Sequence, residues 1–157
     1  MTNLLQFLKK QLSSVPHWVP ISIGIVALGG FADATYLTIE HYMNALPPCV
    51  IGNCELVLTS KFSEIAGVPV ALLGAIYYLA IIILVITYFD TKREVFIRSA
   101  LLVTFVGMIA SLWFTFLQIF VIHAFCQFCL ISAATSTTLF IISIISLKKY
   151  RKPATLL

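Results

Sequence analysis

The chain has 157 residues, of which 61% are hydrophobic and only 10% are charged. No soluble domain of this size needs so apolar a composition, so a water-soluble globular protein is excluded. The formal net charge of +4 follows from cations clustered beside apolar runs, which is a membrane-topology signal. We therefore expect a protein of the lipid bilayer with no nucleic-acid partner.

Four long apolar runs predict membrane-spanning helices. A helix needs about 20 predominantly apolar residues to cross the hydrocarbon core. The sequence supplies such runs at about residues 19–43, 67–89, 97–122 and 125–147. Because they take up most of the chain, we expect an all-α membrane protein with one domain over residues 1–157, built as a bundle of four transmembrane helices. A short interfacial helix is predicted before the first run, where leucines share one helical face at Leu4, Leu5, Leu8 and Leu12.

The first predicted helix carries one acidic residue, Asp33, in the stretch FADATYLT. A carboxylate is costly in lipid, so its side chain should face the bundle interior. Both a structural hydrogen bond and a contact to a bound cofactor remain open for it.

The loop of residues 44–66 contains the first cysteine pair, Cys49 and Cys54. Prolines before Cys49 and the Gly52–Asn53 pair between the cysteines disfavour helix there. From Cys54 onward, apolar positions recur at helical spacing: Val57, Leu58, Phe62 and Ile65. This pattern predicts a short helix that lies over the bundle as a lid.

The basic residues cluster at one side of the predicted bundle. Nine of the ten precede the first run, separate the second from the third, or follow the fourth: Lys9, Lys10, Lys92, Arg93, Arg98, Lys148, Lys149, Arg151 and Lys152. The positive-inside rule then places both termini in the cytoplasm. We expect a multi-pass protein of the cell (inner) membrane, with the loop of residues 44–66 and the turn near His123 on the non-cytoplasmic face.

The second cysteine pair, Cys126 and Cys129, heads the fourth predicted helix in the stretch HAFCQFCL. All four cysteines thus lie on the side where disulfides persist. A helix N-terminus stabilises thiolates. Cys129 lies one turn deeper than Cys126, roughly 4.5 Å at 1.5 Å per residue, so Cys126 should face the loop and Cys129 the bundle interior. A lipid-soluble two-electron acceptor, most simply a quinone, suits the deeper sulfur.

Other uses of four cysteines compete with a redox relay. A zinc site has acceptable ligand spacing, and two static disulfides would suit a non-catalytic membrane scaffold. Zinc gains little on an oxidising face, and a Cys-x-x-Cys bridge closes too small a loop to stabilise much. We therefore predict redox-active pairs and no metal. An unrelated disulfide oxidoreductase of the bacterial periplasm also has four helices and four cysteines. Its Cys-x-x-Cys pair comes early and its wider pair late, which is the reverse of the order in this sequence and disfavours that assignment.

Several motifs together resemble the vitamin K epoxide reductase family in its prokaryotic form. They are the loop cysteine pair, CELVLTSKF with Ser60, GVPVALLG and CQFC. The resemblance covers nearly the whole chain. It implies a bundle around a quinone, menaquinone or ubiquinone, that oxidises a periplasmic or extracellular thioredoxin-like protein and so supports disulfide formation in exported proteins.

The resemblance also implies roles for individual residues. Cys49 and Cys54 would exchange with the partner, Cys126 and Cys129 would reduce the quinone, and Ser60 belongs to the active-site set. For the order of exchange we expect partner attack at Cys54, which frees Cys49 to attack Cys126.

Two differences from other family members bear on partner and substrate. Many bacterial members carry a fused thioredoxin-like domain that this chain lacks, so the partner would act in trans. Apolar Val70 and Ala133 lie near the positions of polar and aromatic quinone contacts in the animal enzymes. Reduction of vitamin K epoxide or quinone is the alternative activity.

Overall fold

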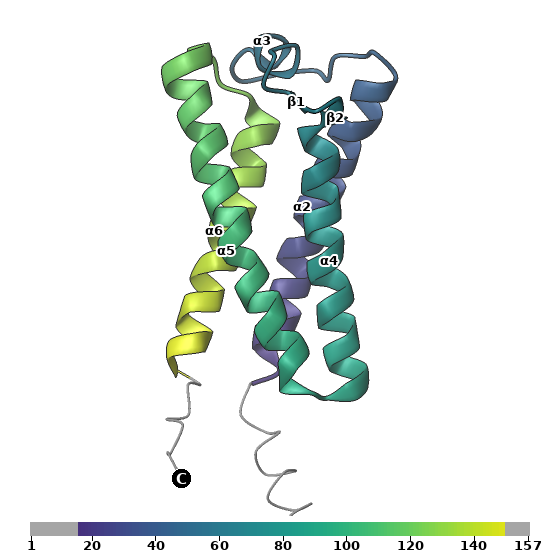
Figure 1. Cartoon of the computed structure of the whole chain (residues 1–157), viewed down its shortest axis with the longest axis vertical. Coiled ribbons are helices and arrows are strands. Elements are labelled where there is room, and N and C mark those ends of the chain that lie inside the picture. Colours follow the sequence, from purple (N-terminus) through teal and green to yellow (C-terminus); the bar gives the residue numbers. More distant parts are fainter. Residues whose placement is uncertain (1–15, 150–157) are drawn as a thin grey trace, which may run out of the picture.

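The structure is a computed structural model that describes residues 16–149. Its elements are α2 (Trp18–Tyr42), α3 (Cys54–Leu58), β1 (Glu64–Ile65), β2 (Val68–Pro69), α4 (Val70–Thr91), α5 (Glu94–Phe116), the π-helix η1 (Leu117–Ile122) and α6 (Gln127–Lys149). The long helices run along the bundle, while α3 and the β1–β2 hairpin lie at one end of it (Figure 1). The predicted interfacial helix at Leu4–Leu12 lies outside the described residues.

The four predicted membrane spans are confirmed as helices long and apolar enough to cross a bilayer. α2 packs against α4 and α6, and α5 packs against α4 and α6. Many large apolar side chains on the outside of the bundle are exposed, such as Ile25 and Ile109. A lipid environment accommodates such a surface, so the protein is a membrane-embedded four-helix bundle.

The second span begins at Val70, three residues later than predicted, because the preceding residues form a hairpin. Ile65 pairs with Val68 and Glu64 pairs with Pro69 in antiparallel register. Ala66 and Gly67 have φ values of 53° and 79°, and a two-residue hairpin turn of type I′ requires positive φ at both positions. His41 Nε2, near the end of α2, lies 3.1 Å from Glu64 Oε1 and links the hairpin to the bundle.

The short lid helix is confirmed as α3, but its predicted continuation is wrong. The helix ends at Leu58, Phe62 lies outside it, and Ile65 belongs to β1. The hydroxyl of Ser60 donates a hydrogen bond of 2.7 Å to the carbonyl oxygen of Val57. Serine side chains that bond to nearby carbonyls compete with helix continuation, which accounts for the early end.

The third and fourth spans differ from the prediction where they meet. The third is α-helical to Phe116 and then widens into η1, and His123 caps the end of η1 with a φ of 53°. α6 begins at Gln127, so Cys126 lies directly before the helix instead of within it.

Tyr78 joins three of the long helices at the centre of the bundle. Its ring packs so closely on Gly30 of α2 that a Cβ there would collide with it. Its hydroxyl lies 2.7 Å from Thr135 Oγ1 and 3.0 Å from Ser136 Oγ, both on α6. Tyr78 is 1% exposed, and these partners satisfy its buried hydroxyl.

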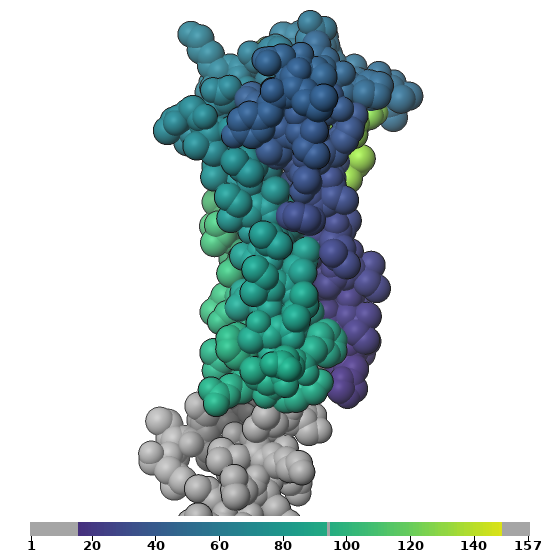
Figure 2. Space-filling model, turned by 90° about the vertical axis from the view of Figure 1, so that its right-hand side faces the viewer, coloured from purple at the N-terminus to yellow at the C-terminus, as the bar shows by residue number. Residues whose placement is uncertain are grey.

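The loop of residues 44–66 covers one end of the bundle and extends beyond the sides of the helices (Figure 2). The connection between α4 and α5, with Lys92 and Arg93, lies at the opposite end (Figure 1). The loop cysteines and these cations therefore lie at opposite ends of the bundle, as the sequence predicts.

Candidate functional site

The structure brings all four cysteines together at the capped end of the bundle. Cys49 and Cys54 form a disulfide with a Cα–Cα distance of 5.9 Å, while Cys126 and Cys129 are thiols. Cys54 and Cys126 belong to one buried cluster, against which Cys49 and Cys129 pack. Two pairs far apart in sequence thus form a single site.

Backbone contacts hold the cysteine loop against the head of α6. The N–H of Asn53 donates a hydrogen bond of 2.8 Å to the carbonyl oxygen of Phe125, and Gly52 forms an antiparallel bridge with Cys126. Gly52 has a φ of +90°, and a Cβ at this position would collide with the Phe125 carbonyl oxygen. Only glycine allows this approach without strain.

Two glutamines that the sequence reasoning did not single out support this junction. The side chain of Gln127 bonds to the loop on both sides of Cys49. Buried Gln118, from η1, accepts a hydrogen bond of 3.2 Å from the N–H of Cys126. The location of Gln127 between the two cysteines of CQFC could have indicated its role in the sequence. No feature of the residues around Gln118 indicates its contact with Cys126.

Cys126 occupies the position that caps the N-terminus of α6. Its carbonyl oxygen accepts a hydrogen bond of 3.0 Å from the N–H of Leu130, as expected for an N-cap residue. A hydrogen bond from the Cys129 thiol lowers the pKa of Cys126 to about 7; burial opposes this, and the backbone N–H groups of Cys129 and Phe128 assist it. The lowered pKa makes Cys126 a good leaving group in thiol–disulfide exchange.

The two loop cysteines differ in accessibility, and the difference disfavours the expected attack at Cys54. Cys54 is 1% exposed and lies in the buried cluster with Cys126. Cys49 is half-buried, and its neighbour Val50 is 87% exposed. A protein-sized thiol reaches the sulfur of Cys49 more readily than that of Cys54.

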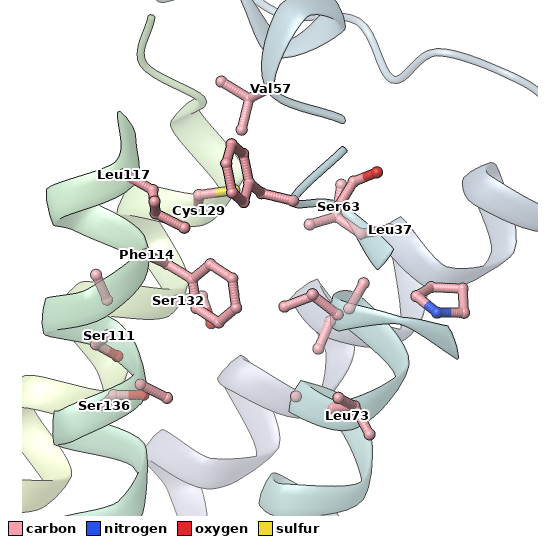
Figure 3. Close-up of a pocket in the computed structure, with 18 of the residues that line it drawn as sticks. Leu37, Val57, Ser63, Leu73, Ser111, Phe114, Leu117, Cys129, Ser132 and Ser136 are labelled. Carbon is pink, nitrogen blue, oxygen red and sulfur yellow. The ribbon is translucent and has the colours of Figure 1, made fainter. Parts of the chain in front are cut away.

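A cavity of about 380 Å³ lies between the helices beneath α3. Cys129, Phe114 and Ser132 border it from α5 and α6, opposite Leu37 and Leu73 of α2 and α4 (Figure 3). Cavities of this size bind small organic ligands. Cys129 borders the cavity, as expected for the deeper sulfur, whereas Cys126 lies in the buried cluster with Cys54.

Polar groups interrupt the mostly apolar wall of this cavity. Asp33 Oδ2 and the Tyr77 hydroxyl are buried and have no hydrogen-bond partner among residues 16–149. Buried polar atoms normally have partners, so two orphans on one cavity suit a ligand with its own polar atoms. Tyr77 can donate a hydrogen bond to such a ligand, and Asp33 Oδ2 can accept one from it.

The other residues predicted for quinone binding also border the cavity. Ser60 lies in its wall, and the hydroxyl that donates to Val57 keeps lone pairs free to accept. Apolar Val70 and Ala133 line it as well. At these two positions the wall is therefore apolar, whereas Asp33, Tyr77 and several serines supply its polar atoms.

A membrane-embedded helical bundle that joins two cysteine pairs at one end, above an apolar cavity, defines the class of membrane thiol oxidoreductases. The sequence model of the vitamin K epoxide reductase family matches residues 21–144, and the chain belongs to this family. This confirms the resemblance drawn from the motifs, and members of the family in general use quinones. No curated protein is similar enough to the chain to match it.

Proposed function

We propose that the protein oxidises a thioredoxin-like partner outside the cytoplasm and delivers the two electrons to a quinone, in support of disulfide formation in exported proteins. One observation carries this proposal. Buried Cys54 and Cys126 share one cluster, against which pack half-buried Cys49, from the loop, and Cys129, which borders the cavity. The four sulfurs form a path from the aqueous face to a site for a lipid-soluble acceptor.

The first half of the relay begins at Cys49. A thiolate of the partner, supplied in trans, attacks Sγ of Cys49; a partner–Cys49 disulfide forms and Cys54 leaves as the thiolate. Cys54 then attacks Sγ of Cys126 in the oxidised Cys126–Cys129 pair. The Cys54–Cys126 bond forms, the Cys126–Cys129 bond breaks, and Cys129 leaves as the thiolate beside the cavity.

The second half restores the loop disulfide. The second thiolate of the partner attacks its own mixed disulfide, so the partner leaves oxidised and Cys49 is released. Cys49 attacks Sγ of Cys54 in the Cys54–Cys126 bond, which reforms the loop disulfide and releases Cys126. The low pKa of Cys126 favours its departure in this step. The net result is an oxidised partner and a Cys126–Cys129 dithiol.

The cavity residues complete the proposal. When bound, the quinone supplies a sink for the two electrons and two protons that the dithiol releases on closing to a disulfide. The Tyr77 hydroxyl would donate a hydrogen bond to a carbonyl oxygen of the quinone, whereas Asp33 and Ser60 would accept hydrogen bonds from the hydroxyl groups of the quinol. Asp33 Oδ2 is also the carboxylate atom in this wall that can take a proton from the Cys129 thiol. Menaquinone and ubiquinone both present the two carbonyl oxygens that this site requires.

One assay tests the proposal directly. Purified protein is mixed with a reduced thioredoxin-like protein and either menadione or a short-chain ubiquinone, and quinone absorbance is followed. We expect quinone loss that requires both protein components and disappears in Cys129→Ser. Absence of turnover, with disulfides that resist mild reduction, would instead support the membrane scaffold. Turnover with vitamin K epoxide but not with a reduced thioredoxin-like protein would support the alternative activity.

A further inference from the structure

Gln127 binds the loop backbone on both sides of Cys49. Its Oε1 accepts hydrogen bonds of 3.1 Å from the N–H of Val50 and 3.2 Å from the N–H of Ile51. Its Nε2 donates a hydrogen bond of 3.3 Å to the carbonyl oxygen of Pro48. One amide group therefore holds the residue before Cys49 and the two residues after it.

Apolar packing contributes little to holding this part of the loop. Val50 is 87% exposed and Ile51 is 69% exposed, so neither side chain packs firmly into the protein. No helix or strand begins between the end of α2 and Cys54. Besides the packing of Cys49 on the buried cluster, residues 48–53 are held at the helix head by these side-chain bonds and by the backbone pairing next to Phe125 and Cys126.

The proposed relay opens the Cys49–Cys54 disulfide just before the step in which the position of Cys54 matters most. When the partner opens the Cys49–Cys54 bond, the loop loses its covalent closure. Cys54 must nevertheless stay beside Cys126 to attack it. An unrestrained loop would spread over many conformations, which lowers the effective concentration of Cys54 at Cys126.

We infer that Gln127 is a positioning residue for electron transfer between the two cysteine pairs, because its amide docks the Cys49 loop on the helix head and keeps Cys54 against Cys126. This inference rests on the proposed relay and extends it with a residue outside the four cysteines. An amide suits the task because the loop offers two N–H groups and one carbonyl oxygen. A carboxylate matches only the N–H groups, and an apolar side chain matches none.

The test measures a disulfide equilibrium and needs neither quinone nor partner. The Cys49→Ser, Cys129→Ser double variant keeps only Cys54 and Cys126. The equilibrium of the Cys54–Cys126 disulfide with oxidised and reduced glutathione gives the effective concentration of the Cys54 thiol at Cys126. Adding Gln127→Met, which is close in size but makes none of the three bonds, should lower that value by about tenfold, since each lost hydrogen bond changes stability modestly. Gln127→Glu should fall between the two.

A matched control separates docking of the loop from local damage to the helix. The Cys49→Ser, Cys54→Ser protein keeps only Cys126 and Cys129, and Gln127→Met should change its equilibrium by less than about twofold, because no loop contact enters that bond. An unchanged Cys54–Cys126 equilibrium in Gln127→Met would overturn the inference, and so would an equal loss in both proteins. Failure of Cys54 and Cys126 to pair even with Gln127 present would overturn the relay itself.

Discussion

The backbone N–H of Asn53 lies 2.8 Å from the carbonyl oxygen of Phe125 and donates a hydrogen bond to it. Each of these residues directly precedes a cysteine, so this bond contributes to placing Cys54 near Cys126. The bond joins a loop near the first membrane span to the head of the last span. It thereby helps to bring the two cysteine pairs into a single site.

The order of partner attack is open to a trapping experiment. A thioredoxin-like protein with one reactive cysteine, activated as a mixed disulfide with thionitrobenzoate, is added to reduced protein that carries Cys126→Ser and Cys129→Ser. With Cys54→Ser added, Cys49 should form a covalent adduct quickly, because it is the more accessible sulfur. With Cys49→Ser added, Cys54 should react at least about tenfold more slowly, because burial excludes a protein-sized reagent.

Release of thionitrobenzoate gives both rates, and a non-reducing gel confirms the adducts. Equal rates, or faster reaction at Cys54, would restore the order expected from the sequence. Loss of the adducts on addition of reductant controls for non-specific association.

The ionisation of Cys126 predicts a pH dependence. In reduced Cys49→Ser, Cys54→Ser protein, ultraviolet absorbance of the thiolate should rise with a midpoint near the Cys126 pKa of about 7. Cys129→Ala removes the thiol that donates to Cys126 and should move the midpoint up toward the ordinary 9.0. Cys126→Ser should lack the near-neutral transition; a transition that persists in this variant would assign it to another group.

The same shift has a consequence for stability, with a definite sign. The folded pKa of Cys126 lies below its unfolded value, so the thiolate contributes fully to the free energy of unfolding above about pH 9. That contribution should be lost as the pH falls through about 7. Thermal unfolding of the reduced protein at several pH values, compared with Cys126→Ser, measures it.

Replacing Asp33 tests its role as a proton acceptor. Asp33→Asn keeps the shape of the side chain but cannot hold the proton from Cys129, so quinone reduction should fall by about 10²-fold, the usual scale for losing an acid–base group. Formation of the Cys54–Cys126 disulfide should not change, because it does not use this carboxylate. Asp90→Asn, at an exposed position near the end of α4, is the control and should retain the parent rate. An Asp33→Asn protein with full turnover would leave Asp33 with a structural role only.

Orientation in the membrane can be read from two engineered cysteines. Lys61 lies in the loop at the capped end, and Arg93 lies in the connection at the opposite end (Figure 1). In protein with serine at the four native positions, Lys61→Cys should react with a membrane-impermeant maleimide added to intact cells. Arg93→Cys should react only after the membrane is opened, because the positive-inside rule places it in the cytoplasm. The reverse pattern would contradict the assigned orientation.

The sequence by itself determined the membrane spans and singled out the four cysteines that the proposed relay uses. Transfer of a helix into lipid is close to a sum over its own residues, so an apolar run predicts a span without knowledge of its neighbours. The same local logic placed Asp33 toward the bundle interior, because no carboxylate is tolerated against lipid. Four cysteines on one predicted face then indicated exchange chemistry.

Tertiary structure alone decided how those groups work together. Gln127 bonds to Val50, which lies 77 positions away in the chain, and no periodicity in either segment indicates that contact. The burial of Cys54, which favours Cys49 as the point of partner attack, and the orphaned oxygens of Asp33 and Tyr77 likewise follow from side chains contributed by different helices. Such features depend on which surfaces meet when the bundle packs, and local composition does not encode that pairing.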